Sequence, residues 1–144
     1  MAAGADAAPS KQLTTCLEEY VQAVSALPDM LRQKFEEIRE RDEQYAELHS
    51  KVEGAVSARV EHLAEACGSL SGPALKKHRA EAAGGAEAKA IDADAAALVG
   101  LADQKVALAQ SCYDIVDSHI QKLDKDLRAF EEQLRRAEGG GDGP

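Results

Sequence analysis

Apolar residues recur every three or four positions over most of the chain, the spacing that gathers them on one face of an α-helix. Between residues 28 and 67 they fall on alternating steps of four and three. This heptad pattern predicts a long helix over 28–67 that packs against another helix along an apolar seam. The predicted seam residues of this helix are Leu31, Phe35, Ile38, Tyr45, Val52, Val56 and Leu63.

Three polar residues, Asp42, His49 and Arg59, fall in the same heptad register. Polar residues on a seam usually weaken packing while they fix the alignment or the number of the helices. We therefore expect these three residues to set register or partner specificity.

A separate short helix is expected before this one, over 15–26. Its start is indicated by Thr15-Cys16-Leu17-Glu18, which has the form of a capping box. Its end is indicated by Leu27-Pro28, because a residue before proline is driven out of the helical region, while proline is tolerated in a first helical turn. Residues 1–12 are small and polar, and we expect them to form a disordered arm.

A third helix is predicted over 87–137, followed by a flexible glycine-rich tail over 138–144. Its apolar residues also lie on one side. The predicted seam residues of this helix are Leu101, Leu108, Cys112, Ile115, Val116, Ile120, Leu123, Leu127, Phe130 and Leu134. His119 is expected half-buried at the border of this seam, as a further candidate for setting register or specificity.

The segment 68–86 is rich in glycine and holds one proline, which indicates a connecting loop with room for one short helical turn. The expected fold is therefore all-α: a short N-terminal helix, then two long helices in an antiparallel hairpin. Such a hairpin leaves apolar side chains in water, and burial of one leucine is worth only about 1.5 to 3 kcal/mol. We expect a coiled-coil homodimer, with parallel and antiparallel pairing both open.

Composition agrees with long helices rather than a globular core, since 30% of the 144 residues are charged, 3% are aromatic and none is tryptophan. The net charge of −9 argues against a nucleic-acid duplex as a direct partner and favours a basic protein segment. Three cysteines without a C-x-x-C pair fit neither a disulfide framework nor a zinc site. No window of eighteen apolar residues and no secretory signal is present, so a soluble, intracellular protein is expected.

Residues 103–134 hold cysteine, histidine and aspartate and could suggest a reactive site. On a helix, however, Asp117 and His119 point about 200° apart, and Cys112 lies about 10 Å from His119 along the axis. A nucleophile and its base must approach to roughly 3 Å. We therefore expect no catalytic site, no metal and no cofactor. The basic run Lys76-Lys77-His78-Arg79 reads either as a nuclear-import signal or as a solvated loop.

Two segments closely resemble the N-terminal domain of the inhibitor-of-growth family. One is "LEEYVQAVSALPDMLRQKFEEIRERD", residues 17–42, and the other runs from Asp103 to Glu131 and includes "VDSHIQKLDKDLRAFE". The resemblance implies a dimeric, non-enzymatic scaffold subunit of a nuclear histone acetyltransferase or deacetylase complex, and contact with histone tails. Composition and periodicity alone would also fit a cytoskeletal or trafficking coiled coil.

Family members continue into a basic linker and a zinc-binding PHD finger that reads methylated lysine. This sequence ends before either, and its three cysteines cannot build the cross-braced zinc sites of such a finger. Reading of a histone mark is therefore expected to be absent here or supplied by another chain. A truncated gene model, a short isoform and a specialised dimerisation partner all fit this ending.

Overall fold

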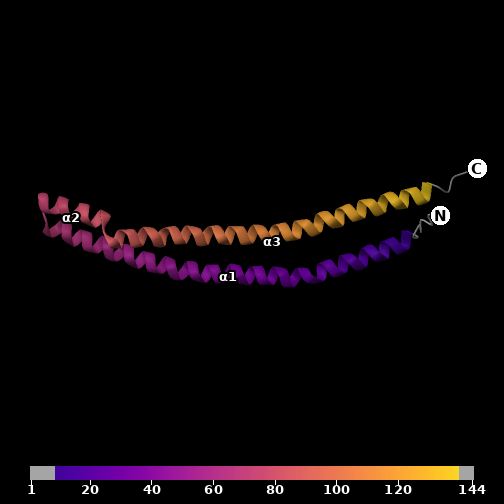
Figure 1. Cartoon of the computed structure of the whole chain (residues 1–144), viewed down its shortest axis with the longest axis horizontal. Coiled ribbons are helices and arrows are strands. Elements are labelled where there is room, and N and C mark those ends of the chain that lie inside the picture. The colour runs from indigo at the N-terminus through magenta and orange to yellow at the C-terminus, as the bar shows by residue number, and fades with distance from the viewer. Residues whose placement is uncertain (1–8, 140–144) are drawn as a thin grey trace, which may run out of the picture. The chain divides into compact units, whose positions relative to one another are not determined.

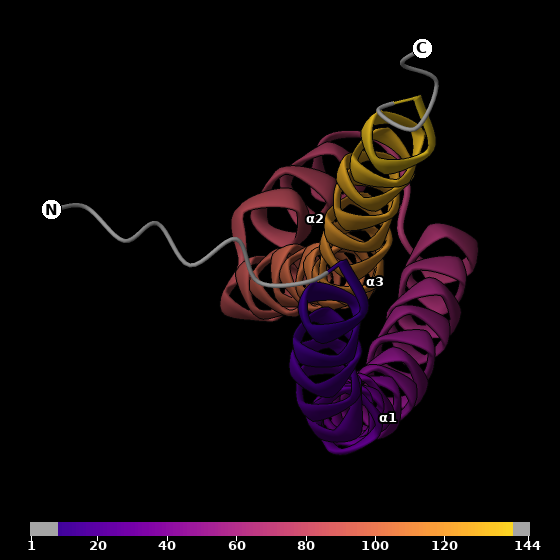
Figure 2. The ribbon, with the colours of Figure 1, turned by 90° about the vertical axis from the view of Figure 1, so that its right-hand side faces the viewer.

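The computed structural model describes the backbone of residues 9–139, and these residues form three helices and no strand. Helix α1 spans Pro9–Ser69, α2 spans Pro73–Gly84 and α3 spans Ala86–Gly139. Figure 1 shows α1 and α3 as the two long helices, and Figure 2 shows α2 as a distinct short helix that links the end of α1 to the start of α3. The predicted all-α class is confirmed.

The chain divides into two compact units, and each long helix contributes to both. Unit 1 comprises residues 1–35 and 110–144, and unit 2 comprises residues 36–109. In unit 2, Arg41 Nε donates to Gln104 Oε1 at 2.8 Å and Lys51 pairs with Asp94 at 2.9 Å. Because the partners' numbers fall along α3 as they rise along α1, the two helices are antiparallel, as the sequence predicted.

Unit 1 pairs the start of α1 with the end of α3, again in antiparallel fashion, since Cys16 contacts Asp126. Its interior is thin, because Cys112 is the one buried apolar residue of the described chain and the other inward side chains are half-buried. A single layer of two helices has no position that neighbours can enclose from all sides, which explains this shallow core.

The predicted break at Leu27-Pro28 is wrong, because α1 continues through Pro28 as one helix. Proline inside a helix removes one backbone hydrogen bond and crowds the preceding turn, at a cost of about 3 kcal/mol. Here Leu27 and Leu31 are half-buried on either side of the proline. Their packing against α3 keeps the chain helical where the local sequence favours a stop.

The start of α1 also lies upstream of the predicted one. Thr15 does not cap a helix, because its hydroxyl donates to the Lys11 carbonyl one turn earlier at 3.0 Å. The helix begins at Pro9, so the last four residues of the predicted disordered arm are helical. The rest of that arm, residues 1–8, and residues 140–144 of the predicted tail lie outside the described residues.

The predicted loop over 68–86 contains the twelve-residue helix α2. Pro73 occupies its first turn, where the missing N–H costs nothing, and residues 74–83 are mostly alanine, lysine and leucine, which are good helix formers. Gly72, at φ 61°, makes the turn that separates α2 from α1. The glycines therefore act only at the two ends of this segment, not throughout it.

On α1 the inward positions differ from the predicted seam. Leu31, Ile38, Tyr45, Val52 and Leu63 are half-buried, as a seam requires, but Lys34, Arg41 and Leu48 take the intervening inward positions. Phe35 is 58% exposed and Val56 is 41% exposed. Lysine and arginine can cover a seam with their aliphatic stems while their charges reach water. A search for apolar residues at heptad spacing does not find these inward lysine and arginine positions.

Candidate functional site

A polar clasp, formed by Arg41, Asp42, Tyr45, Gln104 and Lys105, joins α1 to α3 in unit 2. Arg41 binds Gln104, and Lys105 pairs with Asp42 while its Nζ lies 5.0 Å from the centre of the Tyr45 ring. Asp42 was predicted to set register, and it is one of the residues that carry this contact. Sliding one helix by a turn would break all three interactions, so the clasp favours a single alignment.

The other predicted register residues play separate parts. His49 is exposed, stacks on Tyr45 with ring centres 5.9 Å apart, and lies 3.7 Å from the Glu53 carboxylate. Arg59 is half-buried and binds the Ala82 carbonyl of α2, and its second nitrogen lies 3.8 Å from the Glu87 carboxylate at the start of α3. Arg59 thus ties together all three helices of unit 2.

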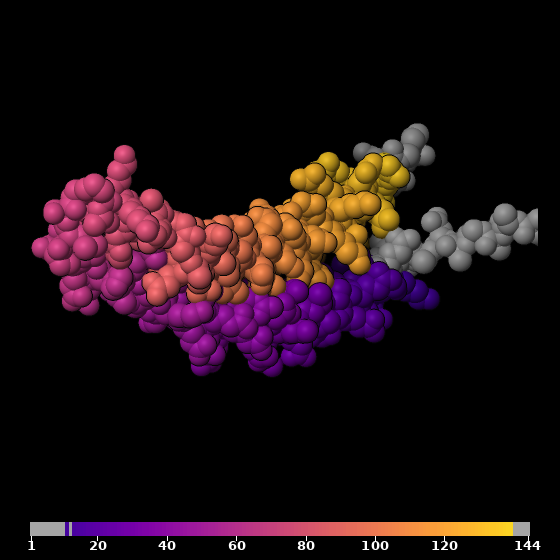
Figure 3. All heavy atoms as spheres, turned by 60° about the vertical axis from the view of Figure 1, so that its left-hand side comes forward, coloured from indigo at the N-terminus to yellow at the C-terminus, as the bar shows by residue number. Residues whose placement is uncertain are grey.

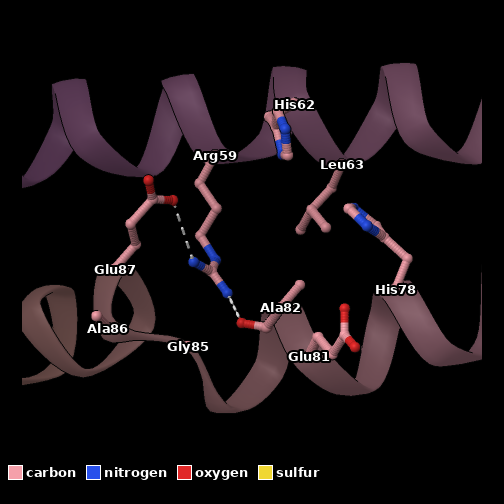
Figure 4. Close-up of a pocket in the computed structure, with 9 residues that line it drawn as sticks. All are labelled: Arg59, His62, Leu63, His78, Glu81, Ala82, Gly85, Ala86 and Glu87. Atoms are coloured by element: carbon pink, nitrogen blue, oxygen red, sulfur yellow. Dashed lines mark hydrogen bonds and ion pairs between the residues drawn. The ribbon is translucent and has the colours of Figure 1, made fainter.

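Beside Arg59 lies an open cavity of about 260 Å³, lined by residues of α1, α2 and the start of α3. Figure 4 shows His62 and His78 pointing into it from α1 and α2, with Leu63 between them. The two imidazole rings are 5.7 Å apart, and Nε2 of His78 is buried without a hydrogen-bond partner. No group of three or more metal-ligating side chains gathers here or elsewhere in the described residues.

In unit 1 the predicted seam residues of α3 divide into two sets. Cys112 is buried, and Ile115, Val116, Leu123 and Phe130 are half-buried against α1, with His119 half-buried among them. Ile120, Leu127 and Leu134 are 53%, 48% and 39% exposed. In unit 2, Leu101 and Leu108 are half-buried.

The exposed set belongs to a regular stripe. Large apolar residues left in water occur at every seventh position of α3 in unit 1, and α1 adds a second stripe. Successive residues of a helix turn by about 100°, and by this count each stripe is rotated in the same direction away from the half-buried positions of its own helix. Because the two helices are antiparallel, rotation in the same direction places both stripes on the same face of the pair. This apolar flank consists of Leu17, Val21, Phe35, Tyr113, Ile120, Leu127 and Leu134.

An acidic ridge lies on α1 in unit 2. Glu36, Glu40, Glu43 and Glu47 are all exposed and follow steps of four, three and four, which aligns them on the side of the helix opposite Tyr45. Glu43 has one cationic neighbour, Arg39 at 3.3 Å, in an exposed pair of low strength. The ridge is about 16 Å long at about 1.5 Å per residue.

The residues that first suggested reactive chemistry have structural partners. The Asp117 carboxylate accepts from Gln121 at 2.6 Å, and Cys112 is buried as a free thiol. Partial burial and then the negative charge of Asp126 raise the pKa of the Cys16 thiol, which disfavours the reactive thiolate. Among the described residues no helix combines the length and apolarity needed to cross a bilayer.

Comparison with known proteins gives one consistent result. Residues 16–130 match the family model described as "Inhibitor of growth proteins N-terminal histone-binding". The chain is 32% identical over 127 residues to "Inhibitor of growth protein 1 homolog" of Dictyostelium discoideum and 34% identical over 124 residues to human "Inhibitor of growth protein 3". No solved structure matches it.

These alignments cover 86% of this chain but only 36% and 27% of the two relatives, so the chain spans about a third of their length. "Inhibitor of growth protein 4" of Gallus gallus is 29% identical over 119 residues, which are 83% of this chain and 43% of that protein. The matched region contains the polar clasp, α2 and most of the apolar flank. From the model match over 16–130, the chain belongs to the inhibitor-of-growth family.

Proposed function

We propose that this chain is a non-enzymatic, homodimeric scaffold that holds a histone acetyltransferase or deacetylase complex together in the nucleus and contacts a histone tail. The observation that carries the scaffold role is the apolar flank of unit 1, seven large side chains that the single chain leaves in water. Family membership supports the chromatin setting.

The size of the flank suits a second copy of the chain. At the exposures of these residues, from 39% to 65%, each contributes roughly 100 Å² of apolar surface, given about 150 to 250 Å² for a whole aromatic side chain. Seven such residues offer roughly 700 Å² per chain, close to the about 800 Å² per partner of a stable protein interface. Two copies related by a twofold axis would form a four-helix bundle in which the flank of each copy covers the flank of the other.

Histone contact is supported by the match to a family model described as histone-binding and by the acidic ridge. Histone tails are rich in lysine and arginine, whose positive charges the carboxylates of the ridge attract. The contact is expected to be weak and salt-dependent, because exposed ion pairs are each worth only about 0 to 1 kcal/mol. Because the ridge lies on the side of α1 that points away from α3, a histone tail can reach it in the folded hairpin.

The tail contact can be tested by titrating an unmodified histone H3 tail peptide into the full chain at low salt. The double variant Glu40→Gln, Glu47→Gln should lose most of the binding. A matched variant, Glu131→Gln, Glu138→Gln, removes the same charge from exposed positions of α3 in unit 1 and should bind as the natural chain does. Equal loss in both variants would show that net charge rather than the ridge attracts the peptide.

The scaffold role can be tested by affinity purification of the tagged chain from nuclear extract, followed by identification of the co-eluting subunits. Subunits of a histone acetyltransferase or deacetylase complex are expected, and a variant that cannot dimerise should retain fewer of them. Recovery of cytoskeletal or trafficking proteins in their place would contradict the proposal.

A further inference from the structure

The short helix α2 carries a basic face made of Lys76, Lys77 and Arg79, all of them exposed. Its one acid, Glu81, lies 3.9 Å from Lys77, with the two side chains 66% and 78% exposed, which is a weak pair. Neither Lys76 nor Arg79 has an ion pair within the described residues. The proposed scaffold and tail contacts make no use of this face.

Several cations of the long helices are paired with acids. Arg39, Lys51, Arg59, Lys105 and Arg136 each lie within 4.0 Å of a carboxylate. The exposed cations Lys122, Lys125 and Arg128 of α3 alternate with acids along the chain, whereas α2 holds three cations within four residues and a single acid. The space-filling view in Figure 3 shows α2, coloured pink, at one end of unit 2, with side chains projecting from it into open space.

The basic face is held in a fixed orientation by contacts on the opposite side of α2. Leu75, His78 and Ala82 are half-buried and follow the i, i+3, i+7 spacing of one helix face. Arg59 of α1 binds the Ala82 carbonyl, and the ring of His62 lies 5.7 Å from that of His78. Because this inner side is anchored to α1, the three cations are presented outward on a formed helix.

We propose that the basic face of α2 docks against the phosphate backbone of duplex DNA. Phosphate contacts are made by lysine and arginine without any need for apolar complementarity. An interface with a folded protein depends instead on a few large apolar or aromatic anchors. The outward residues of α2 beside these cations are Ala74, Ala80 and Ala83, which offer no such anchor. A repetitive polyanion therefore fits this face better than a protein epitope.

The negative charge of the whole chain predicted no contact with nucleic acid, and the local arrangement changes that expectation for α2 alone. Solvent-exposed charges more than about 8 Å apart are largely screened at physiological salt, so the acids of distant turns repel a docked duplex only weakly. The first turn of α2 holds no acid, and the positive end of its helix dipole adds to the three cations. The contact stays weak and confined to this helix.

Fluorescence anisotropy with a labelled 30-base-pair duplex and the full-length chain tests the inference. Three phosphate contacts give a slope of about −2.7 for log K against log salt, so affinity should fall about forty-fold between 50 and 200 mM NaCl. The variant Lys76→Gln, Lys77→Gln, Arg79→Gln should lose at least about ten-fold in affinity at 50 mM NaCl and have a slope near zero. Glutamine preserves helix propensity, and circular dichroism of the variant should match the natural chain.

The control variant is Lys122→Gln, Lys125→Gln, Arg128→Gln, which changes the net charge by the same amount at exposed positions of α3. It should keep its DNA affinity within about two-fold. Equal loss in the two variants, no binding by the natural chain at 50 mM NaCl, or binding of a polyglutamate peptide in place of the duplex would each overturn the inference. The assay needs no partner subunit, so its result does not depend on the proposed scaffold role.

Discussion

Substitution of Ile120 by aspartate should separate the two halves of the proposed dimer without unfolding the chain. Ile120 is 53% exposed in the single chain and lies at the middle of the α3 stripe, between Tyr113 and Leu127. Its outer half contacts nothing within its own hairpin. A carboxylate there costs little in the monomer and faces a desolvated apolar surface in the dimer.

The magnitude follows from that exposed half. Full burial of an isoleucine is worth about 1.5 to 3 kcal/mol, so burial of its exposed half is worth about 0.8 to 1.5 kcal/mol per copy. A twofold dimer contains the substitution twice, which gives about 1.5 to 3 kcal/mol, or a dissociation constant raised about 13- to 160-fold. Desolvation of two carboxylates adds to this loss, so these values are a lower bound.

Sedimentation equilibrium over a concentration series measures the effect. The natural chain should approach twice 15.3 kDa, and Ile120→Asp should remain near 15.3 kDa over the range in which the natural chain is dimeric. Ser118→Asp is the matched control, because Ser118 is exposed, lies on the other side of α3 and gains the same charge. A monomeric natural chain, or equal dissociation caused by Ser118→Asp, would refute the assignment of the flank.

Three further predictions concern stability and reactivity. Gly54→Ala should raise the free energy of unfolding by about 0.5 to 1 kcal/mol, because a Cβ at this position meets nothing within 4 Å and alanine loses less backbone entropy on folding than glycine. The midpoint of urea unfolding measures the change, and a lower midpoint would disprove the reasoning. At pH 8 iodoacetamide should modify exposed Cys67 before Cys16, whose raised pKa leaves less thiolate, and Asp126→Asn should speed the Cys16 reaction. Arg59→Met should cost about 1 to 2 kcal/mol and accelerate hydrogen exchange in α2, whereas unchanged exchange would mean that Arg59 does not hold this helix.

The helical class and the antiparallel hairpin could be read from the sequence because they follow from periodicity and from a glycine-rich connection. The bounds were less accessible. Pro28 carries a local signal for a stop, which the packing of the half-buried Leu27 and Leu31 outweighs. Thr15 carries a signal for a start, but the helix already runs from Pro9 and the Thr15 hydroxyl binds the Lys11 carbonyl. Glycine and proline content predicts a loop for the whole of 68–86, but these residues act only at the ends of the segment, and helix α2 forms between them.

The candidate surfaces were less predictable, because a seam position is defined by what faces it and not by its own residue type. The Asp42 contact to Lys105 could be suspected from a polar residue in heptad register, but nothing in the sequence pairs it with a residue 63 positions away. The half-buried positions of Lys34 and Arg41 had no apolar signal at all. The acidic ridge, by contrast, is visible in the sequence as four glutamates at helical spacing, a local pattern that the total charge does not report.

The displaced seam also explains why the heptad pattern looked so regular. Because Lys34 and Arg41 take inward positions on α1, Phe35 is released to the outside, where it joins Ile120, Leu127 and the rest of the apolar flank. The periodicity of apolar residues does not distinguish the residues that pack between α1 and α3 from the exposed residues that are available to a partner. Both sets repeat every seven residues, so periodicity reports two interfaces as one. Substitutions on the first set should unfold the chain, and those on the second should only separate the copies, which makes this division measurable.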